Sequence, residues 1–229
     1  MLGTIVNSAA IAIGSILGVL LNKGIKEEYR NTIMDGIALT VILIGIMGAL
    51  NNENLILMII SIALGSIIGE ALEIEKKLDN LGASLENRFG KGDSNFSKGF
   101  VTASLVFCVG AMAIVGSLES GLQGNHSTLF AKSIIDGITS VIFASTLGIG
   151  VGFSSFAVLL YQGTITLLAS SIKYLLTPEA INEMSSVGGL LIAAVGINIL
   201  GIKKINVGNM LPAIFIPLIF FTLKGFLGF

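Results

Sequence analysis

The sequence contains few of the residues that commonly build reactive or metal-binding sites. It has one cysteine, one histidine, three prolines and no tryptophan. The single cysteine, Cys108, excludes an internal disulfide and a cysteine-based metal site. The single histidine, His126, cannot cluster with other histidines around a metal, so we expect no metal site and no cofactor. The net charge of −1 gives no indication of a nucleic-acid partner.

Charge of either sign is scarce along the whole chain. Charged residues make up 12% of the 229 residues, about half of the roughly 25% that is typical of soluble domains. Hydrophobic residues make up 53%, and the mean hydropathy is +0.92. This composition indicates an all-α polytopic membrane protein, a transmembrane helical bundle whose main partner is the lipid bilayer. No Ser-His-Asp set, phosphate-binding glycine loop or His-Glu-x-x-His motif is present in the sequence, so we do not expect an enzyme.

Eight segments are apolar enough to cross a membrane. A spanning helix needs about 20 predominantly apolar residues. The first segment has no basic residue before it, which favours a retained helix over a cleaved signal peptide. The predicted spans are residues 3–21, 32–50, 55–72, 100–118, 131–150, 154–174, 187–202 and 209–227.

The basic residues indicate the orientation of these spans. Lysine and arginine accumulate in cytoplasmic loops. With both termini outside, the inner loops hold most of the 13 basic residues. The exceptions, Lys132, Lys173 and Lys224, are interpreted as outer-end residues whose long side chains extend toward water. The sequence therefore predicts a multi-pass protein of a bacterial cytoplasmic (inner) membrane.

The longest connection, residues 73–99, has its own pattern. Ile74, Leu78, Leu81 and Leu85 recur at helical spacing, with charged residues between them. This pattern predicts an amphipathic helix on the cytoplasmic surface. A simple linker and a partner-binding or gating helix are both consistent with it.

Two short motifs that each occur twice suggest a repeat within a single transmembrane domain, residues 1–229. Asp35-Gly36-Ile37 recurs as Asp136-Gly137-Ile138, and Gly14-Ser15 recurs as Gly116-Ser117 at nearly the same offset. We interpret residues 1–72 and 100–174 as two three-helix halves of opposite orientation, followed by a C-terminal helix pair, residues 187–229. Such inverted repeats are common in transporters. Chance similarity stays open as an alternative, because short strings of glycine and serine recur easily in apolar helices.

Glycines spaced four residues apart suggest close helix packing. Such pairs let helix backbones approach each other in lipid; lining of a permeation path is the alternative. The pairs are Gly14 and Gly18, Gly65 and Gly69, and Gly148 and Gly152. In the last span, Pro212 and Pro217 each remove a backbone hydrogen bond and predict a kink or a broken helix.

Several polar residues lie within these apolar spans. An ionised group at the bilayer centre costs at least about 2.5–3.5 kcal/mol, so such residues face protein or water and are candidates for function. Asp35 and Asp136 are predicted near helix starts, where a carboxylate is also favoured by the helix dipole alone. The candidate ion- or substrate-binding residues are Asp35, Asp136, Glu70, Asn7, Gln162 and Asn198.

Three longer stretches resemble a known family. They are CVGAMAIVGSLESGL from Cys108, KSIIDGITSVIFASTLGIGVGFSSFAVLLYQG from Lys132, and GINILGIKKINVGNMLPA from Gly196. Together with GTIVNSAAIAIGSILG near the N-terminus, they resemble the YdfK/YqgA-like family, also called DUF554. The resemblance covers essentially the whole chain and implies a bacterial polytopic membrane protein, but it carries over no site residues.

The sequence therefore predicts a small secondary transporter or ion-permeation protein that moves a small ion or solute. Channel and transporter are not separated by the sequence. We also expect a homodimer. The alternative is a non-transporting scaffold or sensor that acts through the amphipathic helix at Ile74–Leu85.

Overall fold

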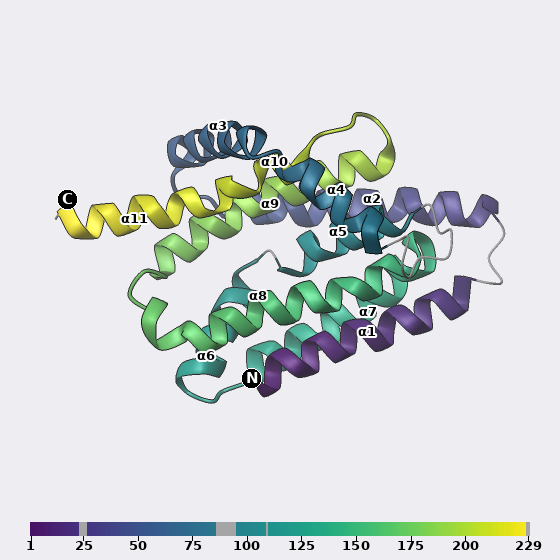
Figure 1. Cartoon of the computed structure of the whole chain (residues 1–229), viewed down its shortest axis with the longest axis horizontal. Coiled ribbons are helices and arrows are strands. Elements are labelled where there is room, and N and C mark those ends of the chain that lie inside the picture. Colours follow the sequence, from purple (N-terminus) through teal and green to yellow (C-terminus); the bar gives the residue numbers. More distant parts are fainter. Residues whose placement is uncertain (23–26, 86–94, 109, 228–229) are drawn as a thin grey trace. The chain divides into compact units, whose positions relative to one another are not determined.

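The computed structural model describes the chain except residues 23–26, 86–94, 109 and 228–229. Every regular element in the described part is a helix (Figure 1), which confirms the predicted all-α class. The elements are α1 (Leu2–Asn22), α2 (Glu27–Leu50), α3 (Leu55–Ala71), α4 (Ile74–Leu85), α5 (Phe96–Cys108), α6 (Ala111–Leu122), α7 (Ser127–Leu147), α8 (Gly150–Ile172), α9 (Pro178–Leu200), α10 (Val207–Met210), the 3-10 helix η2 (Leu211–Phe215) and α11 (Ile216–Leu227).

Each of the eight predicted spans corresponds to one helix or one group of adjacent helices. Six segments in the described residues are long and apolar enough to cross a membrane, and a bent pair, α5 with α6, brings the number to seven. The one remaining predicted span, residues 55–72, corresponds to α3, which has 17 residues and is a shorter apolar helix. The multi-pass character is confirmed, whereas the count of eight and the orientation stay predictions.

The span predicted over residues 100–118 is not one straight helix. Its first part, α5, ends at Cys108, and the axes of Phe96–Cys108 and Met112–Leu122 differ by 61°. Between them, Gly110 has a φ of 124°, a conformation that residues with a Cβ rarely adopt. Hydropathy alone does not reveal such a bend, because both arms are apolar.

The interruption predicted in the last span is present. Residues 207–227 form α10, then the 3-10 turn η2 that contains Pro212, and then α11 with Pro217 in its first turn. Proline lacks the amide hydrogen that a continuous α-helix requires, which accounts for the change of helix type.

Contacts divide the chain into two compact units, and each is described separately. Unit 1 comprises residues 1–35, 78–108 and 112–170, and unit 2 comprises residues 36–77, 109–111 and 171–229. The proposed repeat halves, residues 1–72 and 100–174, stay a prediction.

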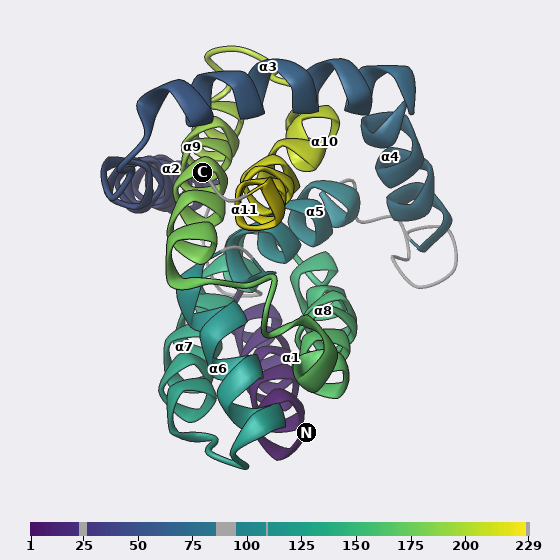
Figure 2. The same cartoon turned by 90° about the vertical axis from the view of Figure 1, so that its left-hand side faces the viewer.

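In unit 1, α1 packs along α7 and contacts α8 through side-chain hydrogen bonds (Figure 2). It runs parallel to α7, because Gly3 faces Leu129 while Gly18 faces Val141. A Cβ at Gly14 would overlap the Gly137 carbonyl, and one at Gly18 would overlap the Val141 carbonyl. This glycine pair therefore has the predicted packing role, because it permits backbone contact between the two helices.

In unit 2, glycines again mark the closest helix contacts. A Cβ at Gly45 of α2 would overlap the backbone of Ala193 in α9, and a Cβ at Gly65 or Gly69 of α3 would overlap the backbone at Ala213 or Asn209. Figure 2 shows α3 passing across α9 and α10. The pair Gly65 and Gly69 thus also serves packing.

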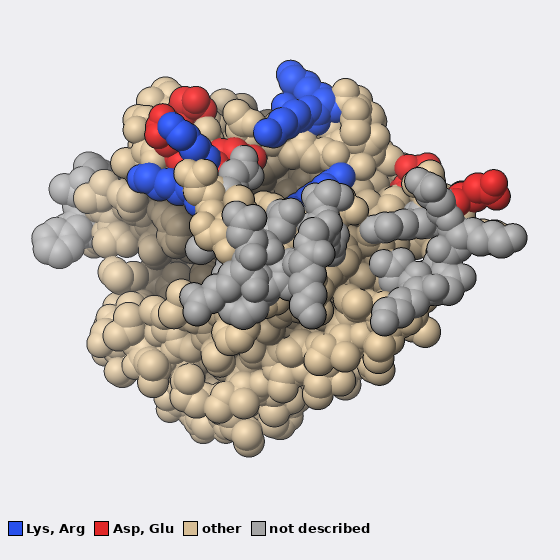
Figure 3. All heavy atoms as spheres, turned by 45° about the vertical axis from the view of Figure 1, so that its right-hand side comes forward, with Lys and Arg blue, Asp and Glu red and all other residues tan. Residues whose placement is uncertain are grey.

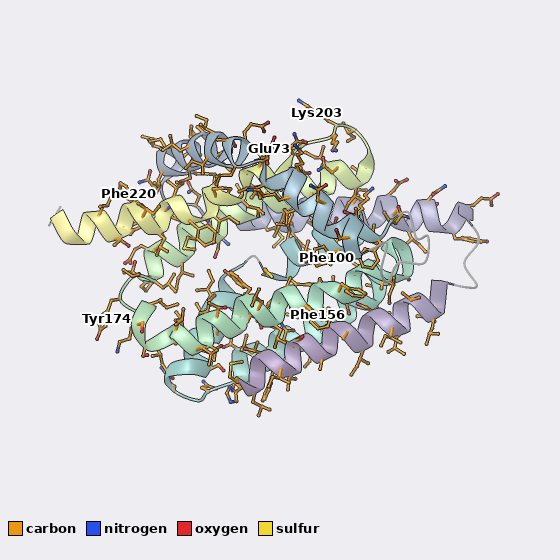
Figure 4. All side chains as sticks on the ribbon, viewed as in Figure 1. Glu73, Phe100, Phe156, Tyr174, Lys203 and Phe220 are labelled. Atoms are coloured by element: carbon orange, nitrogen blue, oxygen red, sulfur yellow. The ribbon has the colours of Figure 1, made fainter. Side chains whose placement is uncertain are left out.

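The outward surfaces of both units are strongly apolar. In the view of Figure 3, charged side chains are confined to a few places, and a broad surface carries only other residue types. Large exposed side chains project from the helices, including Phe156 of α8 and Phe220 of α11, labelled in Figure 4. An exposed apolar surface of this kind is typical of helices in contact with lipid.

Candidate functional site

Three helices of unit 1 enclose a group of polar side chains, which we call the polar cluster: Asn7 of α1, Lys132 and Asp136 of α7, and Gln162 of α8. All four are buried, with exposed fractions of 0% for Asn7 and Gln162, 7% for Lys132 and 4% for Asp136. Three of the six residues predicted from the sequence therefore meet in one place, although they are far apart along the chain.

An ion pair forms the centre of the cluster. Lys132 Nζ lies 3.0 Å from each carboxylate oxygen of Asp136. The two residues are four positions apart, and this spacing places them on the same face of α7. The pair brings opposite charges together where either charge alone would be costly.

Two amide side chains extend the cluster to the neighbouring helices. Asn7 Nδ2 donates to Asp136 Oδ2 at 3.0 Å and to Gln162 Oε1 at 3.4 Å. The cluster is therefore one connected chain of hydrogen bonds from α7 through α1 to α8.

Lys132 does not lie at the outer helix end where the sequence predicted it. We interpreted it as an outer-end lysine that extends toward water, because span five was predicted to begin at residue 131. In the structure α7 begins at Ser127, so Lys132 lies inside the helix and its side chain turns inward to Asp136. The signal was present in the sequence as a lysine four residues before an aspartate within an apolar segment.

The helix-start interpretation of the two aspartates is also wrong. α2 begins at Glu27 and α7 begins at Ser127, so Asp35 and Asp136 both lie well inside their helices. The favourable effect of the helix dipole is limited to about the first turn. Asp136 is buried in the cluster, whereas Asp35 is exposed, so the repeated Asp-Gly-Ile motif occupies two different environments.

The cluster leaves two buried polar atoms without a partner among the described residues. They are Asn7 Oδ1 and Gln162 Nε2, one acceptor and one donor. A buried polar atom without a hydrogen bond costs about 1–3 kcal/mol, so each such atom in a folded protein calls for an explanation.

Polar side chains continue from the cluster toward the start of α1. Thr4 Oγ1 lies 3.4 Å from Thr166 Oγ1, about one helical turn from Asn7 and Gln162. At the start of α1, the Met1 amino group donates to Ser120 Oγ at 3.4 Å, and Ser120 Oγ lies 3.0 Å from His126 Nδ1. The contact between α1 and its neighbours is thus polar over its first part, and buried serines, Ser15 of α1 and Ser140 of α7, continue beyond the fully buried Ile11.

Glu70 and Asn198 lie in unit 2, and each hydrogen-bonds to another residue of the same unit. Asn209 Nδ2 donates to Glu70 Oε2 at 2.6 Å, and the nearby Lys76 pairs with Glu73.

The hydrogen bond between Asn209 and Glu70 is one of two that the Asn209 side chain makes at the turn between α3 and α4. Asn209 Oδ1 accepts from the Glu75 amide at 2.7 Å. Asn198 holds another turn, because its side chain donates to and accepts from the backbone of Ile205. In both places the polar side chains support the backbone of unit 2.

Glu183 of α9 is 2% exposed and is a buried carboxylate that the sequence pattern did not indicate. Its carboxylate accepts from the side chain of Asn52 at 2.5 Å and from the backbone amides of Glu53 and Asn54 at 2.9 and 3.0 Å. It therefore holds the loop before α3. Because residue 183 lies outside the span predicted at 187–202, its burial was not expected.

One other arrangement is a weaker candidate. A groove of about 540 Å³ between α1 and α7 is lined mostly by apolar residues such as Val6, Ile13 and Ile134, and the hydroxyl of its lining residue Ser133 donates to the Leu129 carbonyl. Among the described residues, no group of three or more histidine, cysteine, aspartate or glutamate side chains could hold a metal. The polar cluster is therefore the candidate site.

Comparisons with known proteins agree on one family. The sequence model described as "Protein of unknown function (DUF554)" matches residues 2–222. "Uncharacterized membrane protein YdfK" of Bacillus subtilis (strain 168) is 36% identical over 231 residues, covering 99% of this chain and 98% of the relative. "Uncharacterized protein YqgA" of Escherichia coli (strain K12) is 34% identical over 223 residues, covering 95% of each. No solved structure matches the chain.

Proposed function

The chain belongs to the DUF554 family, and we propose that it is a small transporter or ion-permeation protein whose solute passes by the polar cluster. The observation that carries the proposal is the buried Lys132–Asp136 pair, to which Asn7 of α1 donates a hydrogen bond while it also donates to Gln162 of α8. Ionisable residues inside membrane helices are costly, and they commonly mark solute or ion pathways.

Interrupted helices support the same proposal. Unit 1 contains the bent pair α5 and α6, and unit 2 contains α10, η2 and α11. Discontinuous membrane helices expose backbone polar groups, which is tolerated where they face protein or an aqueous cavity, and they recur in transporters.

The test is solute flux into proteoliposomes that contain the purified protein. Currents on a solid-supported membrane report protons, sodium, potassium and small anions, and osmotic shrinkage reports uncharged solutes. We expect flux above that of empty liposomes and its loss in Asp136→Asn. Asp35→Asn is the matched control, because Asp35 is exposed and should tolerate the same change. A folded protein that moves none of these solutes would contradict the proposal.

The alternative function is a non-transporting scaffold or sensor. Its support is α4, the amphipathic helix predicted from the sequence, with Lys76 and Lys77 exposed. If the protein is a transporter, Lys76→Glu/Lys77→Glu should leave flux unchanged. If the protein is a scaffold, the same double variant should abolish binding to its partner, while Asp136→Asn has no effect on that binding.

We also expect a homodimer in the membrane. Light scattering of the purified protein, corrected for bound detergent, measures the mass of the assembly.

A further inference from the structure

The charges of the polar cluster neutralise each other within the cluster itself. Lys132 contacts both oxygens of Asp136 at 3.0 Å, and Asn7 donates a further hydrogen bond to the same carboxylate. A guest with a net charge would therefore find no free opposite charge there, and it would lose its hydration without compensation.

The orientation of both amides follows from that carboxylate. Only the NH₂ group of Asn7 can donate to Asp136, so Nδ2 must face α7. The same NH₂ group faces Gln162, so Gln162 presents its oxygen to Asn7 and turns Nε2 away. Flipping either amide would place two donors or two acceptors against each other.

This orientation leaves one free acceptor, Asn7 Oδ1, and one free donor, Gln162 Nε2. Both side chains are fully buried, and neither atom has a partner among the residues that the structure describes. The two amides contact each other at 3.4 Å, so the two free atoms belong to adjacent side chains.

We propose that the polar cluster binds small uncharged solutes that carry both a hydrogen-bond donor and an acceptor, such as water, small amides and polyols. This inference rests on the proposed function and narrows its solute class. Such a guest satisfies Asn7 Oδ1 and Gln162 Nε2 together and leaves the ion pair undisturbed.

The residues between the cluster and the start of α1 fit this class. Thr4 and Thr166 are buried hydroxyl side chains that face each other about one helical turn from Asn7 and Gln162. Ser120, also buried, lies beside the start of α1. Hydroxyl groups both donate and accept, and they carry no charge that would select an ion.

The experiment compares acetamide with acetate, which have similar size and differ in charge. Uptake into proteoliposomes is followed by stopped-flow light scattering, with urea and glycerol as further probes, and ionic currents are recorded on the same preparation. We expect acetamide uptake well above that of empty liposomes, little acetate uptake and no ionic current.

Gln162→Met tests the site, since methionine has a similar shape without the donor. Removing one buried hydrogen-bond partner should lower acetamide uptake about tenfold. Thr166→Val should lower it less, and Thr40→Val is the matched control on an exposed face of α2. Circular dichroism confirms that each variant is folded.

Each result has a distinct meaning. Ionic currents or acetate uptake lost in Asp136→Asn would overturn the uncharged class while the proposed function stands. Acetamide uptake that is unchanged in Gln162→Met would overturn the assignment of the site. A folded protein that moves no probe at all would overturn the proposed function together with this inference.

Discussion

At the scale of single residues, the stability of the fold depends on keeping both partners of the buried Lys132–Asp136 pair. Removing one partner of a buried ion pair leaves the other charge uncompensated and costs about 3–5 kcal/mol, whereas replacing both partners by apolar residues is often neutral. We therefore expect Lys132→Met to lower the free energy of unfolding strongly, and Lys132→Met/Asp136→Leu to recover much of the loss.

The measurement is thermal or denaturant unfolding in detergent, followed by circular dichroism because the chain has no tryptophan. Lys76→Met is the matched control, because the Lys76–Glu73 pair is exposed, with side-chain exposures of 67% and 61%. Exposed pairs contribute about 0–1 kcal/mol. If Lys132→Met lowered the free energy of unfolding as little as Lys76→Met, the Lys132–Asp136 pair would not stabilise the fold as a buried pair should.

Glu183 makes a second residue-scale prediction, in unit 2. Hydrogen bonds to charged groups contribute about 1.5–3 kcal/mol each, and Glu183 accepts three from the loop before α3. Glu183→Ala should therefore destabilise the protein by several kcal/mol. Glu53→Ala is the control, because Glu53 contributes only its backbone amide to this contact. Equal stability of the two variants would show that the carboxylate does not hold the loop.

At the scale of helices, the contact of α1 with α7 depends on the absence of side chains at particular glycines. A Cβ at Gly14 would overlap backbone and side-chain atoms of α7, whereas a Cβ at Gly36 of α2 would meet nothing within 4 Å. Overpacking typically costs about 1–3 kcal/mol. Gly14→Ala should lower the unfolding temperature, and Gly36→Ala should leave it unchanged or raise it, because alanine is the better helix former.

The helices themselves could be predicted because apolar length is a local property of the sequence. All eight predicted spans correspond to helical segments, and the amphipathic helix α4 lies where its spacing placed it. The helix starts were placed too late, because polar first turns such as Glu27–Arg30 in α2 do not contribute to an apolar window. For this reason the sequence did not predict that Asp136 lies well inside its helix or that the Lys132 side chain turns inward.

The site could be predicted only in part. Polarity within an apolar span indicated Asn7, Asp136 and Gln162, but not that these three meet, because their contact depends on how α1, α7 and α8 pack. The same limit explains Asn198, which resembled a path residue in the sequence and holds a turn at Ile205 in the structure. Long-range partners follow from packing, which a single sequence does not display.

At the scale of the whole molecule, the number of membrane crossings depends on α3. Its 17 residues, at 1.5 Å per residue, give a length of about 26 Å, a few Å less than the roughly 30 Å hydrocarbon core. Local thinning of the bilayer accommodates a short helix at modest cost. We therefore predict that α3 crosses and that the residues before and after it lie on opposite sides of the membrane.

Single cysteines in a Cys108→Ser background test this prediction in intact cells with a membrane-impermeant maleimide. With the N-terminus outside, cysteine at Glu53 or Asn125 should react, and cysteine at Asn80 or Lys203 should react only after the membrane is opened. All four side chains are exposed in the structure, so a lack of reaction reports the side of the membrane rather than burial. If Glu53→Cys and Asn80→Cys react from the same side, α3 does not cross, and every later helix has the opposite orientation to the one predicted from the lysines.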